Sequence, residues 1–514
     1  MAVSVLAGCG AEKTPAADGK EPAKKEESSK TEDKAPAADA GGVDISEHVD
    51  LTMYLVGDIP EQIDAVYAEV NKILEEECNA TVNVEWLSWA EHDTKYSLLF
   101  SGGEDFDMIF TATTWCHFEQ TTALGGFKAL DEEFIKTYAP ETWEMMPADA
   151  WKQATIDGAI HMVPSNFTEV TPDCVALRGD LVEKYGYEDI TCYDDLVSFY
   201  KDCAADGIYA TTRSGGMYWN WFQDRGYSVL SGAPSSGELI LYSAVDPNAV
   251  DVRYVVEWDA FAEYCHSMKE MTKLGAWNAD VLNSTDDRQD GLLTGRAAGM
   301  GWNVGTCAIY ANEANAAHPE WKVNVYNTAR DNTYVGTKYI NGGMGINAAS
   351  KNPERAMMVI NELLTNPKLQ DLTQLGIEGV NWKAVGDDKY EIIEGAEYTA
   401  SNCWGWRNLD IMRKKHNPNA TAVDLKQAEI EAHYLEHTRA THPLDSFAFD
   451  STSVSTQYAA VEAAMGTYFI PLISGLVDDV DASLAEFKKA MDAAGVQDIV
   501  DEVNRQVEAY MAAQ

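Results

Sequence analysis

A repeating strand–helix order near the start of the chain restricts its fold more than any other sequence feature. Residues 51–56, 82–86 and 106–110 have the apolar or alternating patterns that are typical of strands. Apolar residues recur at helical spacing over 63–74, and a second expected helix over 92–101 ends at a Gly-Gly pair. This β-α-β-α-β order predicts a parallel sheet with helices on both faces, and therefore an α/β protein.

Two later regions also carry helix signals. Asn352 is a candidate cap and Pro353 suits a first helical turn, while the pair Asn366-Pro367 ends the segment. The C-terminal region is expected to be helical, with Gly495 separating its last two helices.

Length and charge limit the possible classes of protein. The chain has 514 residues, too many for one hydrophobic core, so two lobes or domains are expected. The net charge of −45 argues against a nucleic acid partner, because phosphates are bound by Lys and Arg. No run of 18 apolar residues is present, so no segment is expected to cross a membrane.

The N-terminal sequence LAGCG, which contains Cys9, has the pattern of a bacterial lipobox. In such a signal the Cys thiol is acylated and the preceding peptide is removed. Residues 1–9 contain no Lys or Arg, so they are interpreted as a truncated signal; a chance Cys is the alternative. Residues 10–43 are an expected disordered linker, since residues 10–42 contain no Val, Ile, Leu, Phe, Tyr or Trp.

Motifs for metals and cofactors are weak. The sequence HYLEH, from His433 to His437, has zinc-ligand spacing, but a solvated helix face is the favoured interpretation. A GxGxxA pattern begins at Gly343, yet the next expected helix begins too late to hold a pyrophosphate. The other eight cysteines show no metal-like spacing; most are expected to be free, although one or two disulfides remain possible. We therefore expect no metal, no cofactor and no catalytic residue.

Aromatic residues among small and polar neighbours are the candidate ligand contacts. Large aromatics also fill cores, so each has a structural alternative. Trp302 follows a glycine-rich strand end that should face a cleft, and Arg407 could donate to sugar hydroxyls or pair with an acid. The candidate binding residues are Trp115, Trp219, Trp302, Asn303, Trp404, Trp406 and Arg407.

Motifs spread along the whole chain resemble one protein family. The sequence resembles extracellular solute-binding lipoproteins of carbohydrate ABC importers, most of all the LipO-type subgroup with a DUF3502 C-terminal region. No single motif is decisive, but their order is. The segments that carry the resemblance include LFSGGEDFDMIFTA (99–112), GGFKALDE (125–132), DGAIHMVP (157–164), LLTGRAAGMGWN (292–303), GIEGVNW (376–382) and SFAFDSTSV (446–454).

The resemblance implies a two-lobe, periplasmic-binding-protein-like fold of type II with a ligand cleft between the lobes and a helical C-terminal region. Lobe 1 is expected to comprise residues 44–166 and 335–385. Lobe 2 is expected to comprise residues 167–334 and 386–514.

The resemblance also implies a function. We expect a monomeric receptor that captures a neutral oligosaccharide by lobe closure and delivers it to the ABC permease subunits. It would be lipid-anchored through Cys9 at the outer face of a bacterial, Gram-positive cell membrane. The alternatives are an extracellular carbohydrate-active enzyme and a receptor for a peptide or another non-sugar solute.

Overall fold

The first of two sheets that carry the fold confirms the expected parallel order. The structure, a computed structural model, describes residues 43–213, 216–234, 238–243, 246, 250–396, 398, 403–439 and 442–512. Cys9 and the expected linker through residue 42 lie outside this part. The first sheet has the strand order β2-β1-β3-β13-β6, and β1 pairs in parallel with β2 and β3. Its strands are β1 (Val49–Val56), β2 (Ala80–Leu87), β3 (Met108–Thr111), β6 (Val163–Pro164) and β13 (Gly343–Ile346).

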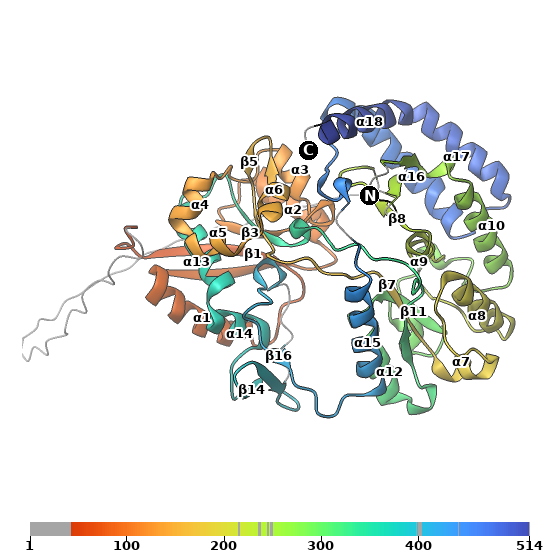
Figure 1. Ribbon diagram of the computed structural model, residues 1–514, viewed down its shortest axis with the longest axis horizontal. Coiled ribbons are helices and arrows are strands. Elements are labelled where there is room, and N and C mark those ends of the chain that lie inside the picture. The colour runs from red at the N-terminus through yellow and green to blue at the C-terminus, as the bar shows by residue number, and fades with distance from the viewer. Residues whose placement is uncertain are drawn as a thin grey trace, which may run out of the picture. The chain divides into compact units, whose positions relative to one another are not determined.

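Helices from two distant parts of the chain cover this sheet (Figure 1). Alternating strand residues are almost fully buried, such as Leu51, Met53 and Leu55 in β1, and they form a core with the helices. The helices of this lobe are α1 (Ile63–Cys78), α2 (His92–Gly102), α3 (Phe118–Ala123), α4 (Glu132–Tyr138), α5 (Pro140–Met145), α6 (Ala148–Gln153), α13 (Pro353–Thr365) and α14 (Pro367–Leu375).

Several helix ends agree with the sequence, and one start differs. Gly103 follows α2 with φ 70°, and Gly495 ends α17 with φ 84°, a left-handed conformation that glycine adopts easily. Asn352 precedes α13 but its side chain makes no capping hydrogen bond. Asn366 instead caps the next helix, because its side chain accepts a hydrogen bond from the Lys368 N–H at 3.1 Å.

The second lobe has its own cores around an antiparallel sheet of order β11-β7-β12. Its strands are β7 (Asp173–Leu177), β11 (Gly299–Asn303) and β12 (Asn324–Tyr326), with a smaller sheet of β8 (Tyr227–Val229), β9 (Ile240–Ser243) and β10 (Val252–Tyr254). Its helices include α7 (Gly179–Tyr185), α8 (Tyr193–Ala205), α9 (Tyr218–Asp224), α10 (Asp259–Lys273), α11 (Asp290–Leu293), α12 (Val304–Ala317) and α15 (Ala422–Glu436).

The C-terminal region is helical, as expected. It consists of α16 (Ser455–Ile473), α17 (Val480–Ala494) and α18 (Val496–Ala512), which pack on the second lobe (Figure 1). Val496, Ile499, Val503 and Val507 recur at helical spacing and are buried, so one face of α18 joins the core. Within the described residues, no helix combines the length and the apolar character that a membrane span requires.

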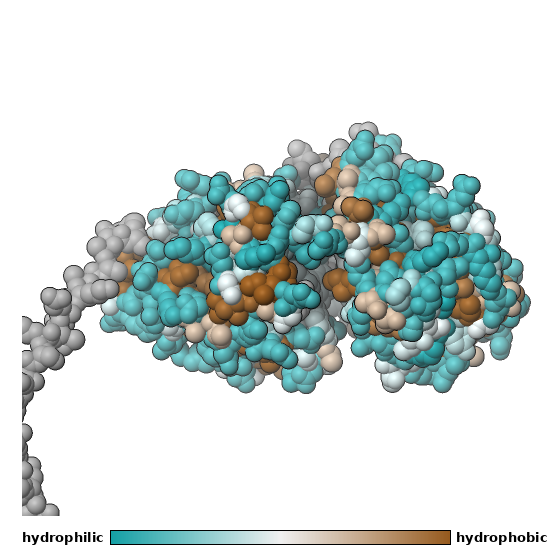
Figure 2. Space-filling view, turned by 90° about the horizontal axis from the view of Figure 1, so that it is seen from below, coloured by the Kyte–Doolittle hydropathy of each residue, from teal (hydrophilic) through white to brown (hydrophobic). Residues whose placement is uncertain are grey.

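In the described part of the chain, three passages join the two lobes, which the space-filling view shows side by side with a groove between them (Figure 2). The first passage joins β6 to β7 and the second joins β12 to β13, and the expected boundaries at 166/167 and 334/335 fall in them. The expected boundary at 385/386 would separate β14 (Trp382–Val385) from its antiparallel partner β15 (Lys389–Ile392). Tyr398 and Trp406 also pack in the first core. This packing favours a third boundary between β16 (Lys414–Lys415) and α15.

Candidate functional site

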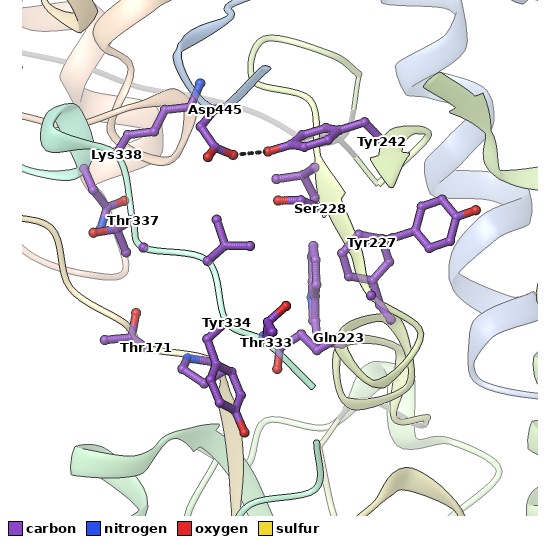
Figure 3. A pocket seen from close by; sticks show the side chains of 18 of the residues that line it. Thr171, Gln223, Tyr227, Ser228, Tyr242, Thr333, Tyr334, Thr337, Lys338 and Asp445 are labelled. Atoms are coloured by element: carbon purple, nitrogen blue, oxygen red, sulfur yellow. Dashed lines mark hydrogen bonds between the residues drawn. The ribbon is translucent and has the colours of Figure 1, made fainter. Parts of the chain in front are cut away.

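A cavity of about 380 Å³ lies between the two cores, and we call it the cleft cavity. The first lobe contributes Thr113 and Trp115, which follow the carboxyl end of β3, where ligands bind in open α/β sheets. The second lobe contributes residues 219–231 around α9 and β8, together with Tyr242 and Asp445. The two earlier chain passages supply Thr171, Pro172 and residues 333–338 (Figure 3).

The two passages that line the cavity are hydrogen-bonded to each other. The Thr337 N–H donates to the Glu169 carbonyl oxygen at 2.7 Å, and the Glu169 N–H donates to the Thr337 hydroxyl at 2.9 Å. The Ser165 N–H donates to the Tyr339 carbonyl oxygen at 3.0 Å. The passages therefore form one paired connection beside the cavity, a suitable place for hinge motion.

Most side chains that line the cleft cavity are neutral and polar or aromatic. The close-up in Figure 3 shows hydroxyl, amide and phenol groups around the space. Such groups can donate and accept hydrogen bonds with a polyhydroxyl ligand without a large desolvation cost. The neutral polar and phenolic residues that line it are Thr113, Thr171, Gln223, Tyr227, Ser228, Ser231, Tyr242, Asn332, Thr333, Tyr334, Thr337 and Asn341.

Asp445 is a charged lining residue whose charge is already compensated. Its carboxylate forms an ion pair with the Arg439 guanidinium at 2.9 Å and accepts the Tyr242 hydroxyl at 2.5 Å (Figure 3). It also accepts the backbone N–H of His442 at 2.6 Å. Burial raises the pKa of Tyr242, so its phenol stays protonated and continues to donate.

Lys338 is the second charged lining residue, and its ammonium is also engaged within the protein. It donates to the Phe447 carbonyl oxygen at 2.8 Å, and desolvation lowers its pKa to about 8. The Glu119 carboxylate attracts it, and burial raises the pKa of Glu119. The Glu119 carboxylate accepts a hydrogen bond from the Ser231 hydroxyl at 3.2 Å. This hydrogen bond joins α3 of the first lobe to the second lobe.

Three tryptophans of the first lobe form an aromatic cluster beside the cavity. Trp89 stacks near Trp115, with ring centroids 6.5 Å apart, and lies 5.8 Å from Trp404. Trp89 is 40% exposed and Trp404 is 38% exposed, while the Trp115 indole N–H donates to Asn341 at 3.2 Å. Trp89 was not among the binding residues predicted from the sequence, although it follows β2 in the same way that Trp115 follows β3. Exposed indole faces are suited to the C–H faces of sugars.

The structure brings some predicted site residues to the cavities and separates others. Trp115 and Trp219 line the cleft cavity, and Trp302 lines a second cavity in lobe 2. Asn303 caps α12, because its side-chain oxygen accepts the Thr306 N–H at 2.9 Å. Trp404 belongs to the aromatic cluster at the first lobe.

Trp406 and Arg407 require a correction. Trp406 is 1% exposed, packs in the first core and donates its indole N–H to the Thr373 hydroxyl at 3.0 Å. Arg407 forms an ion pair with Glu169 at 2.8 Å, beside the paired passages. Neither residue lines the cleft cavity or the second cavity. Trp406 is a core residue, and Arg407 follows the alternative of pairing with an acid, which fastens a chain passage.

The two motifs that were weighed for metal and nucleotide binding are placed in ordinary structure. His433 contacts the Arg330 carbonyl oxygen at 2.9 Å, and its ring stacks on His437 with centroids 4.0 Å apart. In the described part of the chain, no cluster of three potential metal ligands is found. The GxGxxA pattern begins in the buried strand β13.

Comparisons with known proteins agree with the predicted resemblance. A family described as "Domain of unknown function (DUF3502)" matches residues 443–512. A carbohydrate ABC transporter substrate-binding protein of Streptococcus pneumoniae serotype 4 is 22% identical over 482 residues, which are 92% of this chain and 92% of that protein.

Solved structures show the same fold. The N-glycan transport solute binding protein NgtS of Streptococcus pneumoniae has a TM-score of 0.71 and 21% identity, covering 91% of this chain and 99% of that chain. An HMO-binding, ABC-transporter-associated solute binding protein of Bifidobacterium longum infantis has a TM-score of 0.64 and 13% identity, covering 88% of this chain and 97% of that chain. The expected two-lobe solute-binding fold and the resemblance to carbohydrate-importer receptors are both confirmed.

Proposed function

We propose that this protein is the substrate-binding component of an ABC importer, and that it captures a neutral oligosaccharide by lobe closure and delivers it to the membrane permease. The observation that carries the proposal is the cleft cavity between two separately packed lobes. Its neutral polar and aromatic lining suits a polyhydroxyl ligand. Similarity to substrate-binding proteins of carbohydrate importers supports the same function.

The charges in the cleft cavity favour a receptor over a glycoside hydrolase. Such enzymes use two carboxyl groups across the scissile bond, about 5–10 Å apart. Among the described residues that line this cavity, Asp445 is the only carboxylate, and Arg439 and Tyr242 already bind it. The lining therefore offers recognition groups rather than an acid–base pair.

A panel of purified glycans tests the proposed function. Man1GlcNAc and Man5GlcNAc, which are bound in structures of the Streptococcus pneumoniae neighbour, would be included with plant and milk oligosaccharides and with short peptides. A true ligand present at 100 times its dissociation constant should raise the free energy of unfolding by about 2.7 kcal/mol. Thermal unfolding measures this stabilisation, and calorimetric titration then measures the dissociation constant of each glycan that stabilises the protein.

The same mixtures, analysed by mass spectrometry after incubation, separate a receptor from an enzyme. Intact glycans with a thermal shift would support the proposal. Shortened glycans would favour the enzyme alternative, and a shift with peptides alone would favour a peptide receptor.

We further propose that Cys9 carries a lipid anchor that holds a monomeric receptor at the outer face of a Gram-positive cell membrane. The lipobox LAGCG and the polar segment that follows it support this proposal. When a complete lipoprotein signal sequence is placed before Cys9, the wild-type protein should fractionate with membranes. The Cys9→Ala variant should appear in the medium, and Cys78→Ala, a buried position, is the matched control. A Cys9→Ala variant that stays on membranes would contradict the anchor.

A further inference from the structure

A second cavity, of about 290 Å³, lies in the second lobe next to the cleft cavity, and we call it the lobe 2 cavity. Trp219 lines both spaces, and Pro172 of the cleft cavity directly precedes Asp173 of the lobe 2 cavity. Gln223 of the cleft cavity accepts the Asp173 backbone N–H at 2.8 Å. The two cavities are therefore neighbours that share a wall.

Asp173 lines the lobe 2 cavity, and the Arg288 guanidinium is the charged group that acts on its carboxylate. Among the described residues, its carboxylate has no hydrogen bond and no ion pair, although it lies at the beginning of the buried strand β7. Burial raises its pKa to about 6, while the Arg288 guanidinium lowers it. A carboxylate in this setting gains from a ligand that donates hydrogen bonds to it.

The Arg288 guanidinium is the complementary group. It stacks on the Trp302 ring, 3.5 Å from the ring centroid, and within the described chain it makes no hydrogen bond or ion pair. Burial lowers its pKa, but an Arg side chain stays protonated in proteins and keeps five N–H donors. Arg288 lies over one face of the Trp302 ring, and the ring is 42% exposed, so this indole can orient the guanidinium and still offer surface to a sugar.

Two unpaired opposite charges in one cavity define the chemistry of its ligand. Asp173 and Arg288 attract each other, but no ion pair joins them among the described residues. Arg213 also lines the cavity, but its guanidinium pairs with the Asp287 carboxylate at 3.7 Å. The charges of Asp173 and Arg288, which have no ion pair of their own, sum to zero, and this favours a neutral ligand over an anion or a cation. A sugar hydroxyl can donate to the carboxylate, and an adjacent hydroxyl oxygen can accept from the guanidinium.

We infer that the lobe 2 cavity is a separate subsite, which binds one neutral sugar unit between Asp173 and Arg288, while neighbouring units of the same oligosaccharide occupy the cleft cavity. The inference rests on the proposed function. It extends that function by assigning the oligosaccharide ligand a minimum length of two sugar units and by naming Asp173 and Arg288 as the residues that recognise one of them. Trp219 borders both cavities, so the sugar units in the two cavities would be consecutive units of one oligosaccharide.

Calorimetric titration of the purified protein with the same glycan panel tests the subsite. The variants Asp173→Asn and Arg288→Gln should each weaken binding about 10- to 100-fold, the size of one hydrogen bond to a charged group. Asp251→Asn and Arg253→Gln are matched controls, since these residues pair with each other at 2.9 Å and line neither cavity. Thermal unfolding of each unliganded variant verifies its fold. If Asp173→Asn unfolds, the partly exposed Arg288 still provides the test.

The outcomes separate the subsite from the proposed function. If wild-type protein binds a glycan and both variants bind it within twofold, the subsite is overturned and the receptor function stands. If a monosaccharide binds as tightly as the oligosaccharide, the two-unit span is overturned. If no glycan binds the wild type, the proposed function is overturned and the subsite with it.

The pH profile supplies a readout that a structural role would not change. Arg288 faces Asp173 from the segment before α11. Cys307 of α12 and Tyr434 of α15 also interact with Asp173. Burial raises the pKa values of these two groups, so both stay neutral. The ionised carboxylate accepts the sugar hydroxyl, so wild-type affinity should fall as the pH is lowered through about 6. Asp173→Asn should remove this fall. A variant that keeps the wild-type profile would overturn the assignment of Asp173.

Discussion

Replacing Trp406 with alanine should lower the free energy of unfolding by roughly 3–5 kcal/mol, the usual cost of deleting a buried aromatic side chain. The indole is 1% exposed and belongs to the first core with strands β1 and β3. Its removal would leave a cavity and take the donor from the Thr373 hydroxyl, which now accepts the indole N–H at 3.0 Å. Urea denaturation of the wild type and the variant measures the loss.

Trp404→Ala is the matched control, because it removes the same side chain two positions earlier. Trp404 is 38% exposed, and its ring centroid lies 5.8 Å from that of Trp89. We expect this variant to change the free energy of unfolding by less than about 1 kcal/mol. If the aromatic cluster contacts the ligand, Trp404→Ala should reduce glycan affinity while the fold is kept. A Trp406→Ala variant that is stable but loses glycan binding would contradict its place in the core.

The first-lobe sheet could be predicted because its signals are local. The strands β1, β2 and β3 alternate with helices whose apolar spacing and glycine ends are visible in short windows of sequence. The strand β13 could not be placed in the same way. It enters the sheet antiparallel to β3 from more than 200 residues along the chain, and no local pattern specifies such a pairing.

The candidate site was predicted only in part, for a related reason. Trp115 and Trp219, which line the cleft cavity, were selected as candidates because aromatic residues among polar neighbours stand out in a sequence. Trp404 and Trp406 share one such stretch, and composition alone could not tell which indole faces the core. Asp173 and Asp445 were missed because they are two of 83 acidic residues, and Arg288 because it is one of 38 basic residues without a distinguishing motif. Their importance depends on which distant residues surround them.

Asp445 connects the C-terminal region with the cleft cavity, and its removal is the second large expected effect. It lies in the short turn Pro443–Ser446, inside the region that matches DUF3502, and its carboxylate holds both Arg439 and the Tyr242 hydroxyl. The Arg439 side chain is only 7% exposed. Asp445→Ala removes its ion-pair partner, and losing one partner of a buried pair costs roughly 3–5 kcal/mol.

A double-mutant cycle distinguishes this ion pair from general packing. Arg439→Met combined with Asp445→Ala should be more stable than Asp445→Ala alone, because the double variant no longer buries the Arg439 guanidinium without the Asp445 carboxylate. Asp450→Ala is the control on the same segment: it is exposed, accepts a hydrogen bond from the Thr452 N–H at 2.9 Å, and should cost less than about 1 kcal/mol.

The same cycle tests whether the C-terminal region shapes the ligand site. Tyr242 lines the cleft cavity, and Asp445 fixes its hydroxyl at 2.5 Å. Variants without Asp445 should therefore bind glycan more weakly even under conditions where they remain folded, and Tyr242→Phe should show part of the same loss. Additive stability effects of Asp445→Ala and Arg439→Met, together with unchanged glycan affinity, would show that this region supports the fold without shaping the cavity.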